Sequence, residues 1–343
     1  MHSLRYLPGL VPVIALITTD ALATEPVTEN EIIVTAARTE QNLDANLRAA
    51  TVITRQDIER LQPTDLNELL SAQTGIVIAN NGGTGKDSSL YIRGGNTGHV
   101  LILVNGIRIG SATLGSATLQ DIPVSQIERI EIVRGPVSSL YGSEALSGVI
   151  QIFTRKETAS PVISVSTGNH GQESLSATGA GASENGWMSV GVARLRTDGI
   201  DVLSNGNQPD TDGYDNESGS LGIGYRFSEE TLLEINALRV RSQNDYDASY
   251  SGAPDTSRNT QQSFSAKLDY RPGESYLSRL SVGRSSDIAD SYDQSTFVSH
   301  FATRREVLNW QNEWSPGNTQ KVLAGIDYQQ DLVDGTSTYS QTQ

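Results

Sequence analysis

The sequence predicts an α+β domain followed by an antiparallel transmembrane β-barrel. Residues up to about 157 mix helix and strand signals, whereas the rest of the chain repeats alternating segments of the length that a tilted membrane strand needs. The connections between those segments alternate between long and very short. We expect a signal peptide over residues 1–23, a linker over 24–42, the α+β domain over 43–157 and the N-terminal part of the barrel over 158–343.

The first 23 residues have the organisation of a secretory signal peptide. Arg5 supplies a positive charge, residues 7–19 are mostly apolar, and residues 21–23 (Ala-Leu-Ala) form a cleavage motif of small residues. The alternative is a buried N-terminal helix, which Pro8 and Pro12 disfavour. We therefore expect export into the envelope of a Gram-negative cell and location in its outer membrane.

Composition argues against several classes of protein. The net charge of −15 disfavours binding to nucleic acid, which requires a basic surface. The chain has no cysteine, which excludes disulfide scaffolds, thiolate metal sites and cysteine nucleophiles. No run of apolar residues is long enough for a transmembrane helix.

The α+β domain contains one clear helix and several strands. Residues 64–70 read as a short capped amphipathic helix. Residues 101–104 read as a buried strand, Asn105-Gly106 as a tight turn, and residues 107–109 as the returning strand. Residues 127–133 alternate well enough to be a further strand.

After residue 158 apolar and polar side chains alternate, as expected of strands with one face toward lipid. Leu221, Ile223, Tyr225 and Phe227 point to one side, and smaller or charged residues lie between them. We place nine strands near residues 161–168, 172–182, 187–197, 217–227, 230–243, 260–271, 276–287, 302–315 and 319–331.

The lengths of the connections distinguish a membrane barrel from a soluble sandwich. Long loops on one side and tight turns on the other are typical of outer-membrane barrels. The long connections are 198–216, 244–259 and 288–301, and the short ones are 183–186, 228–229, 272–275 and 316–318.

Aromatic residues gather near the short turns, where one membrane interface is expected; the alternative is a soluble β core. They are Trp187, Tyr225, Phe227, Tyr270, Tyr276 and Trp314.

Five segments follow one another in an order that resembles one family. The β-prone run 30–38 precedes 91–95 (YIRGG), 99–109 (HVLILVNGIRI), 127–136 (IERIEIVRGP) and 140–150 (LYGSEALSGVI). This succession resembles the plug of TonB-dependent outer-membrane receptors, and among them most closely the cobalamin (BtuB-type) receptors. The resemblance implies a plug inside a barrel of 22 strands.

About nine strands are recognised here, so we expect a C-terminally truncated barrel. An open sheet in lipid leaves backbone groups unsatisfied. We therefore expect transport to belong to a longer parent protein, which we expect to be a monomer.

The β-prone run near the N-terminus has two interpretations. An extended segment can pair with the exposed sheet edge of another protein, or it can be the first strand of the following domain. The resemblance implies the first, with the TonB box at Glu31, Ile32, Ile33, Val34, Thr35 and Ala36. It also implies TonB, with ExbB and ExbD, as the energising partner.

Two arginines match positions that lock the plug in this family. The resemblance implies that Arg93 and Arg134 pair with barrel glutamates, which we expect beyond residue 343. An enclosed guanidinium needs carboxylate partners to offset its desolvation. The alternative is a pair of solvent-exposed arginines.

Eight aspartates lie in or beside two long loops that leave the same membrane face. They are Asp198, Asp201, Asp210, Asp212, Asp215, Asp245, Asp247 and Asp255. Crowded carboxylates repel one another unless a hard cation lies among them, and oxygen ligands suit calcium. An EF-hand is excluded because Leu221 stands where its last ligand belongs.

The resemblance to the cobalamin receptors implies two calcium ions in these loops. The implied ligands are Asp201, Asp210, Asp212, Tyr246, Asp247 and Asp255. The alternative is solvated acidic loops, or loops that diffuse divalent ions bridge to lipopolysaccharide.

Contacts to the transported ligand are expected from the outward plug loops 80–89 and 110–119. The resemblance marks Asn81, Ser88, Ser89, Ser111 and Leu114. The pair Lys86-Asp87 departs from the family pattern, which leaves the identity of the corrinoid open. The alternative interpretation of Lys86 and Asp87 is a surface ion pair, which contributes little to stability.

We predict active, TonB-dependent transport of cobalamin or a related corrinoid. The alternative within the same architecture is a receptor for a ferric siderophore or another metal chelate. A passive porin or adhesin would lack the plug motifs. An outer-membrane hydrolase would need a catalytic cluster, and His99, His170 and His300 lie in none of the hydrolase motifs, so we predict no enzyme.

Overall fold

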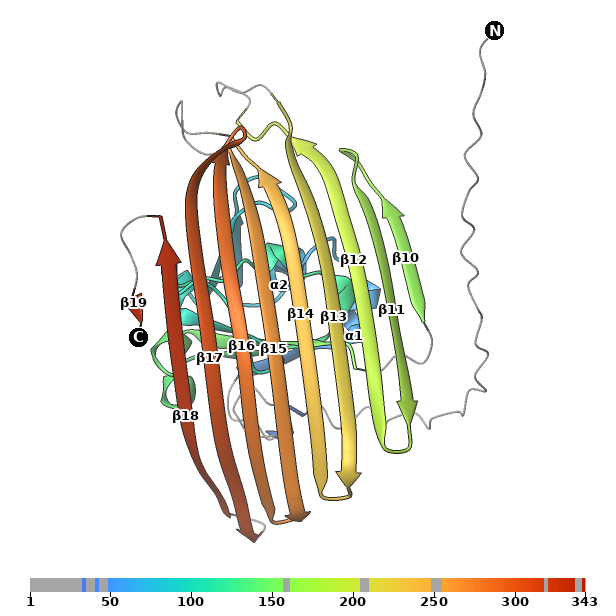
Figure 1. The fold of residues 1–343 in the computed structure, drawn as a ribbon, viewed down its shortest axis with the longest axis vertical. Coiled ribbons are helices and arrows are strands. Elements are labelled where there is room, and N and C mark those ends of the chain that lie inside the picture. The colour runs from blue at the N-terminus through green and yellow to red at the C-terminus, as the bar shows by residue number, and fades with distance from the viewer. Residues whose placement is uncertain are drawn as a thin grey trace.

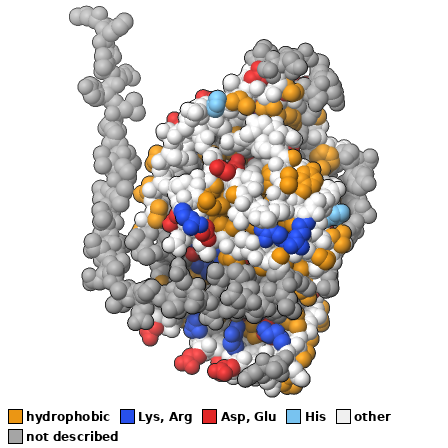
Figure 2. Space-filling view, turned by 180° about the vertical axis from the view of Figure 1, so that it is seen from behind, with side chains coloured by type: hydrophobic (Ala, Val, Ile, Leu, Met, Phe, Trp, Pro, Cys, Tyr) orange, Lys and Arg blue, Asp and Glu red, His pale blue; other side chains and the backbone are white. Residues whose placement is uncertain are grey.

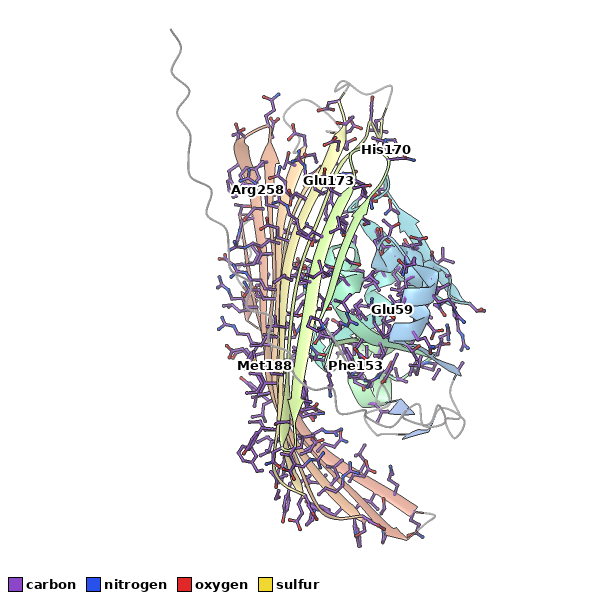
Figure 3. The ribbon with its side chains drawn as sticks, turned by 90° about the vertical axis from the view of Figure 1, so that its right-hand side faces the viewer. Glu59, Phe153, His170, Glu173, Met188 and Arg258 are labelled. Carbon is purple, nitrogen blue, oxygen red and sulfur yellow. The ribbon has the colours of Figure 1, made fainter. Side chains whose placement is uncertain are left out.

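A computed structural model shows a small mixed domain packed against one curved antiparallel sheet (Figures 1 and 3). We call residues 49–156 the plug domain and the sheet that begins at Val162 the wall sheet. None of the helices in the described part of the chain is long and apolar enough to cross a membrane. The structure describes residues 33–34, 41–42, 49–156, 161–203, 210–247, 255–317, 320–336 and 341–342.

The plug domain is built on a five-stranded mixed sheet. Its strands lie in the order β3 (Ala49–Ile53), β8 (Ile127–Arg134), β9 (Gly148–Thr154), β6 (Val100–Val104) and β7 (Ile107–Arg108). Only β6 and β9 pair in parallel among these strands. A separate hairpin joins β4 (Ile76–Asn80) to β5 (Ser88–Ile92). Before the domain, β1 (Ile33–Val34) pairs with β2 (Gln41–Asn42).

Short helices cover this sheet and connect its strands. The α-helices are α1 (Arg55–Leu61), α2 (Leu66–Ser71) and α3 (Ser138–Tyr141). The single 3-10 turns are η2 (Thr97–His99), η3 (Leu119–Asp121), η4 (Val124–Gln126) and η5 (Ser143–Ala145).

The helix predicted near residues 64–70 is confirmed as α2. The Asp65 side chain accepts a hydrogen bond from the Glu68 amide, which satisfies a free donor at the start of the helix. Leu66, Leu69 and Leu70 are buried in the core. Helix α1 was not predicted, although Thr54 and Asp57 close a reciprocal capping box at its first turn.

The predicted hairpin around Asn105-Gly106 is confirmed. Asn105 has φ +48° and Gly106 has φ +84°, the left-handed pair that a tight hairpin turn requires. All five residues of β6 are buried, because the strand lies between β9 and β7 inside the domain.

The wall sheet joins successive antiparallel strands in chain order (Figure 1). The strands are β10 (Val162–Thr167), β11 (Glu173–Ser183), β12 (Gly186–Ile200), β13 (Asp212–Ser228), β14 (Thr231–Asp245), β15 (Thr256–Gly273), β16 (Tyr276–Asp293), β17 (Thr296–Gly317), β18 (Gln320–Gly335) and β19 (Gln341–Thr342). The nine long strands β10–β18 confirm the predicted series.

The two faces of the wall sheet differ as the alternation predicts. On the face away from the plug domain, Phe227 and Ile326 are each 62% exposed. On the face toward the plug domain, Gln261, Ser263 and Ser265 are buried. Most apolar side chains therefore point outward and most inward side chains are small and polar, because successive residues of a strand alternate between faces. Leu238 and Val240 of β14 are exceptions that pack inward on the plug core.

The predicted long connection 288–301 is wrong. Strands β16 and β17 continue through this region and meet at a tight turn, with Asp293 opposite Thr296. Gln294 takes φ +54° in that turn. The polar sequence there resembles a loop, but backbone pairing beyond the apolar band requires no apolar alternation.

A buried carboxylate joins the plug domain to three wall strands. Asp121, at the end of η3, accepts hydrogen bonds from Tyr214 Oη at 2.7 Å, Ser242 Oγ at 2.8 Å and Asn259 Nδ2 at 3.5 Å. The Asp121 carbonyl accepts a further bond from Asn216 Nδ2 at 3.0 Å. Burial raises the pKa of Asp121 to about 6, although the donors from Tyr214 and Ser242 oppose this effect.

This raised pKa predicts that Asp121 contributes less to the stability of the folded chain as pH rises. Its folded-state pKa exceeds the unfolded value, so the stabilisation present below about pH 4 is lost as pH rises to about 6. Between pH 5 and 7.5 the wild type should lose on the order of 1 kcal/mol more unfolding free energy than Asp121→Asn. Thermal unfolding of both proteins at both pH values measures this difference. An identical pH dependence would contradict it.

Candidate functional site

The candidate site lies where two plug loops meet the outer ends of the wall strands. The first, which we call the ligand loop, comprises residues 81–87 between β4 and β5. The second, residues 109–118, connects β7 to η3. Gln120 Nε2 donates to Asp87 Oδ1 at 3.4 Å and links the two regions. Basic side chains form clusters elsewhere on the plug side of the molecule (Figure 2).

The ligand loop is folded around the side chain of Asn80. Asn80 Oδ1 accepts hydrogen bonds from the amides of Gly82 and Gly83 at 2.9 and 2.6 Å. The Asn81 amide donates to the Asp87 carbonyl at 3.1 Å and closes the loop. These hydrogen bonds define the shape of the loop from within.

Gly85 lets the ligand loop pack directly on β13. Its φ is +77°, and a Cβ at this position would lie 2.1 Å from the ring of Tyr214. Gly82 approaches the wall in the same way, because a Cβ there would lie 2.6 Å from Val202. Any side chain at either position would push the loop away from the wall.

The predicted ligand contacts on this loop are not equivalent. Asn81 is exposed and Ser89 is half-buried. Ser88 Oγ donates to the Lys86 carbonyl at 2.9 Å and accepts from Asn67 Nδ2 at 2.8 Å. The Ser88 hydroxyl thus supports the loop from within.

The second loop presents an apolar side chain at its tip. Leu114 is 76% exposed, and its amide donates to Ser111 Oγ at 3.2 Å. The Ser111 amide donates to the Ser116 carbonyl at 2.9 Å, and the Ala112 amide donates to Thr303 Oγ1 of β17 at 3.0 Å. Ser111 therefore shapes the loop, and Leu114 is exposed at its tip.

The structure brings together some of the predicted calcium ligands. Asp212 Oδ2 accepts from the Val202 amide at 2.9 Å, and Asp247 Oδ2 accepts from the Leu203 amide at 2.6 Å. The carboxylates of Asp210 and Asp247 both act on the charge of Asp212.

Two carboxylate oxygens remain without a partner in this region. Asp201 Oδ1 and Asp247 Oδ1 are buried and have no hydrogen-bond partner among the described residues. A buried oxygen of this kind is suited to a cation. No group of three acidic or histidine side chains forms a metal site within the described part of the chain.

The other two predicted ligands lie toward the β16–β17 turn. The Tyr246 amide donates to the Asp255 carbonyl at 2.8 Å. Asp255 Oδ1 accepts from the Gln294 amide at 2.9 Å and from Thr256 Oγ1 at 3.3 Å. Asp255 therefore stabilises that turn.

Lys86, which is not among the predicted site residues, contributes a positive charge to this region. Its side chain is 3% exposed, and Nζ donates hydrogen bonds to oxygens at the outer ends of β13 and β14. Burial lowers the pKa of Lys86, whereas nearby Asp212, Asp245 and Asp87 raise it. The only feature of the sequence that sets this position apart is the Lys86-Asp87 pair, which departs from the pattern of the family that the chain resembles.

The two predicted lock arginines lie side by side next to Gly75. A Cβ at Gly75 would lie 3.9 Å from both side chains, and Arg93 has φ +50°. Arg134 Nη1 donates to Thr51 Oγ1 at 2.7 Å, while Arg134 Nε is buried without a hydrogen-bond partner. Burial, and secondarily the charge of Arg93, lower the pKa of Arg134. Neither arginine pairs with a carboxylate within the described residues.

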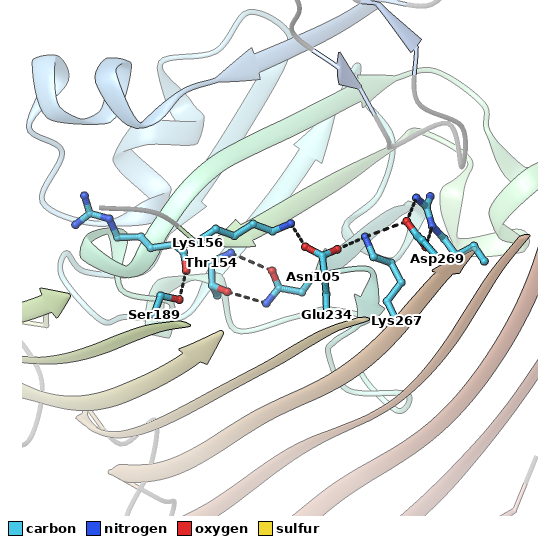
Figure 4. Close-up of polar contacts among 9 residues, drawn as sticks. Asn105, Thr154, Lys156, Ser189, Glu234, Lys267 and Asp269 are labelled. Carbon is cyan, nitrogen blue, oxygen red and sulfur yellow. Dashed lines mark hydrogen bonds and ion pairs between the residues drawn. The ribbon is translucent and has the colours of Figure 1, made fainter. Parts of the chain in front are cut away.

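A row of alternating charges fastens the end of the plug domain to the wall (Figure 4). Glu234, which is buried on β14, pairs with Lys156 and with Lys267. Lys267 lies 3.9 Å from Asp269, which makes a bidentate pair with Arg279 at 2.7 Å. Each buried charge in the row has an oppositely charged neighbour, as desolvated ions require.

Polar bonds next to this row hold the same end of the domain (Figure 4). Ser189 Oγ donates to the Arg155 carbonyl at 2.6 Å, and Arg155 Nη1 donates to Thr178 Oγ1 at 2.7 Å. Asn105 and Thr154 exchange two hydrogen bonds at 2.9 and 3.0 Å. No local sequence pattern indicates this anchor, because its partners are separated by up to 78 residues.

The predicted TonB box falls largely outside the described residues. Ile33 and Val34 form β1, whereas Glu31, Ile32, Thr35, Ala36 and the predicted signal peptide lie outside them.

Residues 43–149 match the family model "TonB-dependent Receptor Plug Domain". The chain is 32% identical over 313 residues to the vitamin B12 transporter BtuB of Photobacterium profundum, covering 90% of this chain and 51% of that protein. It therefore spans about half the length of this curated relative.

Solved structures share the fold at low identity. A variant of the ferric enterobactin receptor PfeA of Pseudomonas aeruginosa has a TM-score of 0.70 and 20% identity, covering 88% of this chain and 51% of that one. The receptor FpvA of P. aeruginosa, bound to a heterologous pyoverdine, has a TM-score of 0.74 and 13% identity, covering 91% and 46%.

Close packing at Gly85 predicts a position-specific effect of alanine. Gly85→Ala should destabilise the receptor by about 1–3 kcal/mol more than Gly83→Ala, because its Cβ meets the Tyr214 ring. Gly83 is the matched control: its φ is also positive, at +105°, but its Cβ would meet nothing within 4 Å. Thermal unfolding of both variants measures the difference. Equal losses would show that the ligand loop does not pack on β13 as described.

Proposed function

This chain belongs to the TonB-dependent receptors, and on that premise we propose that it serves the uptake of cobalamin or a related corrinoid across the outer membrane. The observation that carries the proposal is the similarity to a vitamin B12 transporter, which extends over 90% of the chain and so includes both plug domain and wall. The homologues are outer-membrane proteins, and we propose the same location here, reached through the predicted signal peptide.

Transport requires the plug domain to yield without leaving the wall entirely. The proposed TonB box precedes the plug domain in the chain, whereas the charge row of Lys156 and Glu234 fastens its other end. A pull applied at the box by TonB, with ExbB and ExbD, would therefore act first on elements far in sequence from the anchor. The adjacent Arg93 and Arg134 are suited to a lock that needs carboxylate partners.

The outward loops offer a surface suited to a large amphipathic ligand. Exposed Leu114 supplies apolar contact, while Asn81 supplies amide hydrogen bonds. Ser89 and Ser111 belong to these two plug segments, and Ser88 supports the ligand loop from inside. A ferric siderophore or another metal chelate is the alternative ligand. The solved relatives do not favour it, because at 13–20% identity they indicate the fold alone.

We also propose that calcium binds among the acidic outer loops. Asp201 and Asp247 each have a buried, unpartnered oxygen, and Asp212 lies beside Asp247, so these side chains fit a hard cation. Bound calcium would neutralise the repulsion between the carboxylates. Lipid and lipopolysaccharide are the expected surroundings of the outer face. Transport, rather than catalysis, is the activity that the family favours.

Titration of the complete receptor with cyanocobalamin tests the ligand. We expect an affinity in or below the micromolar range with calcium present, and a loss of at least about tenfold when a chelator removes the metal. Asp212→Asn should reduce the part of the cyanocobalamin affinity that depends on calcium. Asp215→Asn is the matched control, because it also removes a carboxylate of β13, but one that pairs with Arg194 of β12.

Binding weaker than micromolar under both conditions would exclude the corrinoid. In that case a ferric chelate, tested in the same titration, is the remaining candidate within this architecture. Equal effects of Asp212→Asn and Asp215→Asn would exclude Asp212 from the calcium site.

A further inference from the structure

A buried lysine of the ligand loop lies in a site made of oxygens from the wall. Lys86 Nζ donates to Asn244 Oδ1 at 2.7 Å, to the Asp245 carbonyl at 2.7 Å and to the Gly213 carbonyl at 3.1 Å. An ammonium has three donors, and all three are used. The acceptors come from the outer ends of two neighbouring strands, β13 and β14.

We propose that Lys86 is a built-in cation of the acidic outer loops, which clamps the ligand loop to the ends of β13 and β14. The three bonded oxygens are carbonyl and amide oxygens, so no single carboxylate neutralises the ammonium. The negative charge comes instead from surrounding Asp212, Asp245 and Asp87. An ammonium among neutral oxygens within an acidic surround occupies the kind of position that a bound metal cation takes.

Burial makes this arrangement specific for a cation. A lysine side chain that is 3% exposed has lost its hydration. Its charge is tolerated only where each ammonium N–H has an acceptor and nearby carboxylates supply negative charge. Asn244 is itself buried, and its oxygen would lose this partner if the ammonium were removed. The clamp therefore depends on both sides being present.

The packing of the loop places Lys86 where a clamp is effective. Gly82 on Val202 and Gly85 on Tyr214 bring the loop backbone against the wall on the approach to Lys86. Immediately after it, Ser88 Oγ donates to the Lys86 carbonyl and leads into β5. Movement of the wall ends is thereby transmitted to the ligand loop through the hydrogen bonds of Lys86 together with these packing contacts.

The clamp also changes the charge of the acidic loops. One positive charge arrives with the plug domain itself, so the ends of β13 and β14 are partly neutralised before any metal binds. Calcium cannot substitute for this contact mechanically, because only Lys86 is covalently part of the ligand loop. The clamp holds whatever ligand the receptor takes, so its test is independent of the proposed corrinoid.

Spin-label distances in the complete receptor test the clamp. This chain has no cysteine, so Gly83→Cys in the ligand loop and Gln243→Cys on β14 can be labelled as a pair. We expect a narrow distribution of distances between the two labels, which becomes at least about twofold broader in Lys86→Met. Added calcium should not narrow the distribution of this variant again. Lys321→Met removes a half-exposed lysine elsewhere on the wall and should leave the distribution unchanged.

A second variant approaches the clamp from the wall. Asn244→Leu should broaden the same distribution, and the double variant should be no broader than the broader single variant, because both remove one contact. A label pair at Glu173 and Arg258, both on the wall, establishes that each variant retains an intact sheet. The proposal is overturned if Lys86→Met matches Lys321→Met, or if calcium alone restores the narrow distribution.

Discussion

The structure depends on one constraint: polar groups buried between the plug domain and the wall must find partners in each other. The inner face of the wall sheet is lined mainly with small polar side chains, whereas most of the exposed apolar side chains lie on its outer face. Buried polar groups without partners cost free energy, so the plug domain must present matching donors and acceptors. Asp121 does so at three strands, β13, β14 and β15, while Lys86 does so at the ends of β13 and β14 and Lys156 does so at Glu234 of β14.

The positions of these contacts explain how a plug domain can be both secure and releasable. Lys86 and Asp121 lie toward the outer loops, while the charge row around Glu234 holds the last residues of the domain. Polar and ionic contacts can be exchanged for water one at a time, and among the described wall residues only Leu238 and Val240 of β14 join the larger apolar core of the plug domain. A plug domain attached in this way can separate from the wall in steps, with its ligand loop responding to the wall ends.

The sequence predicted features that depend on local or periodic patterns. The alternation that places Phe227 outward, the turn at Asn105-Gly106 and helix α2 all follow from neighbouring residues, and the structure confirms them. The loop predicted at 288–301 failed because backbone pairing continues there with polar side chains. The contacts of Lys86 and Asp121 join residues more than 90 positions apart, and only the three-dimensional arrangement reveals them. The structure groups the predicted calcium ligands only in part, because Asp255 stabilises the β16–β17 turn.

A double-mutant cycle across the plug–wall contact tests this account most directly. Lys156→Met, Glu234→Gln and the double variant would be compared in the complete receptor by urea titration, with hydrogen exchange in β9 reporting release of the plug domain. If buried ion pairing holds the domain, the effects of the two substitutions on the free energy of unfolding should be coupled by about 1–3 kcal/mol. The plug domain should then be released no more readily in the double variant than in the less stable of the two single variants. Strictly additive effects would contradict the account.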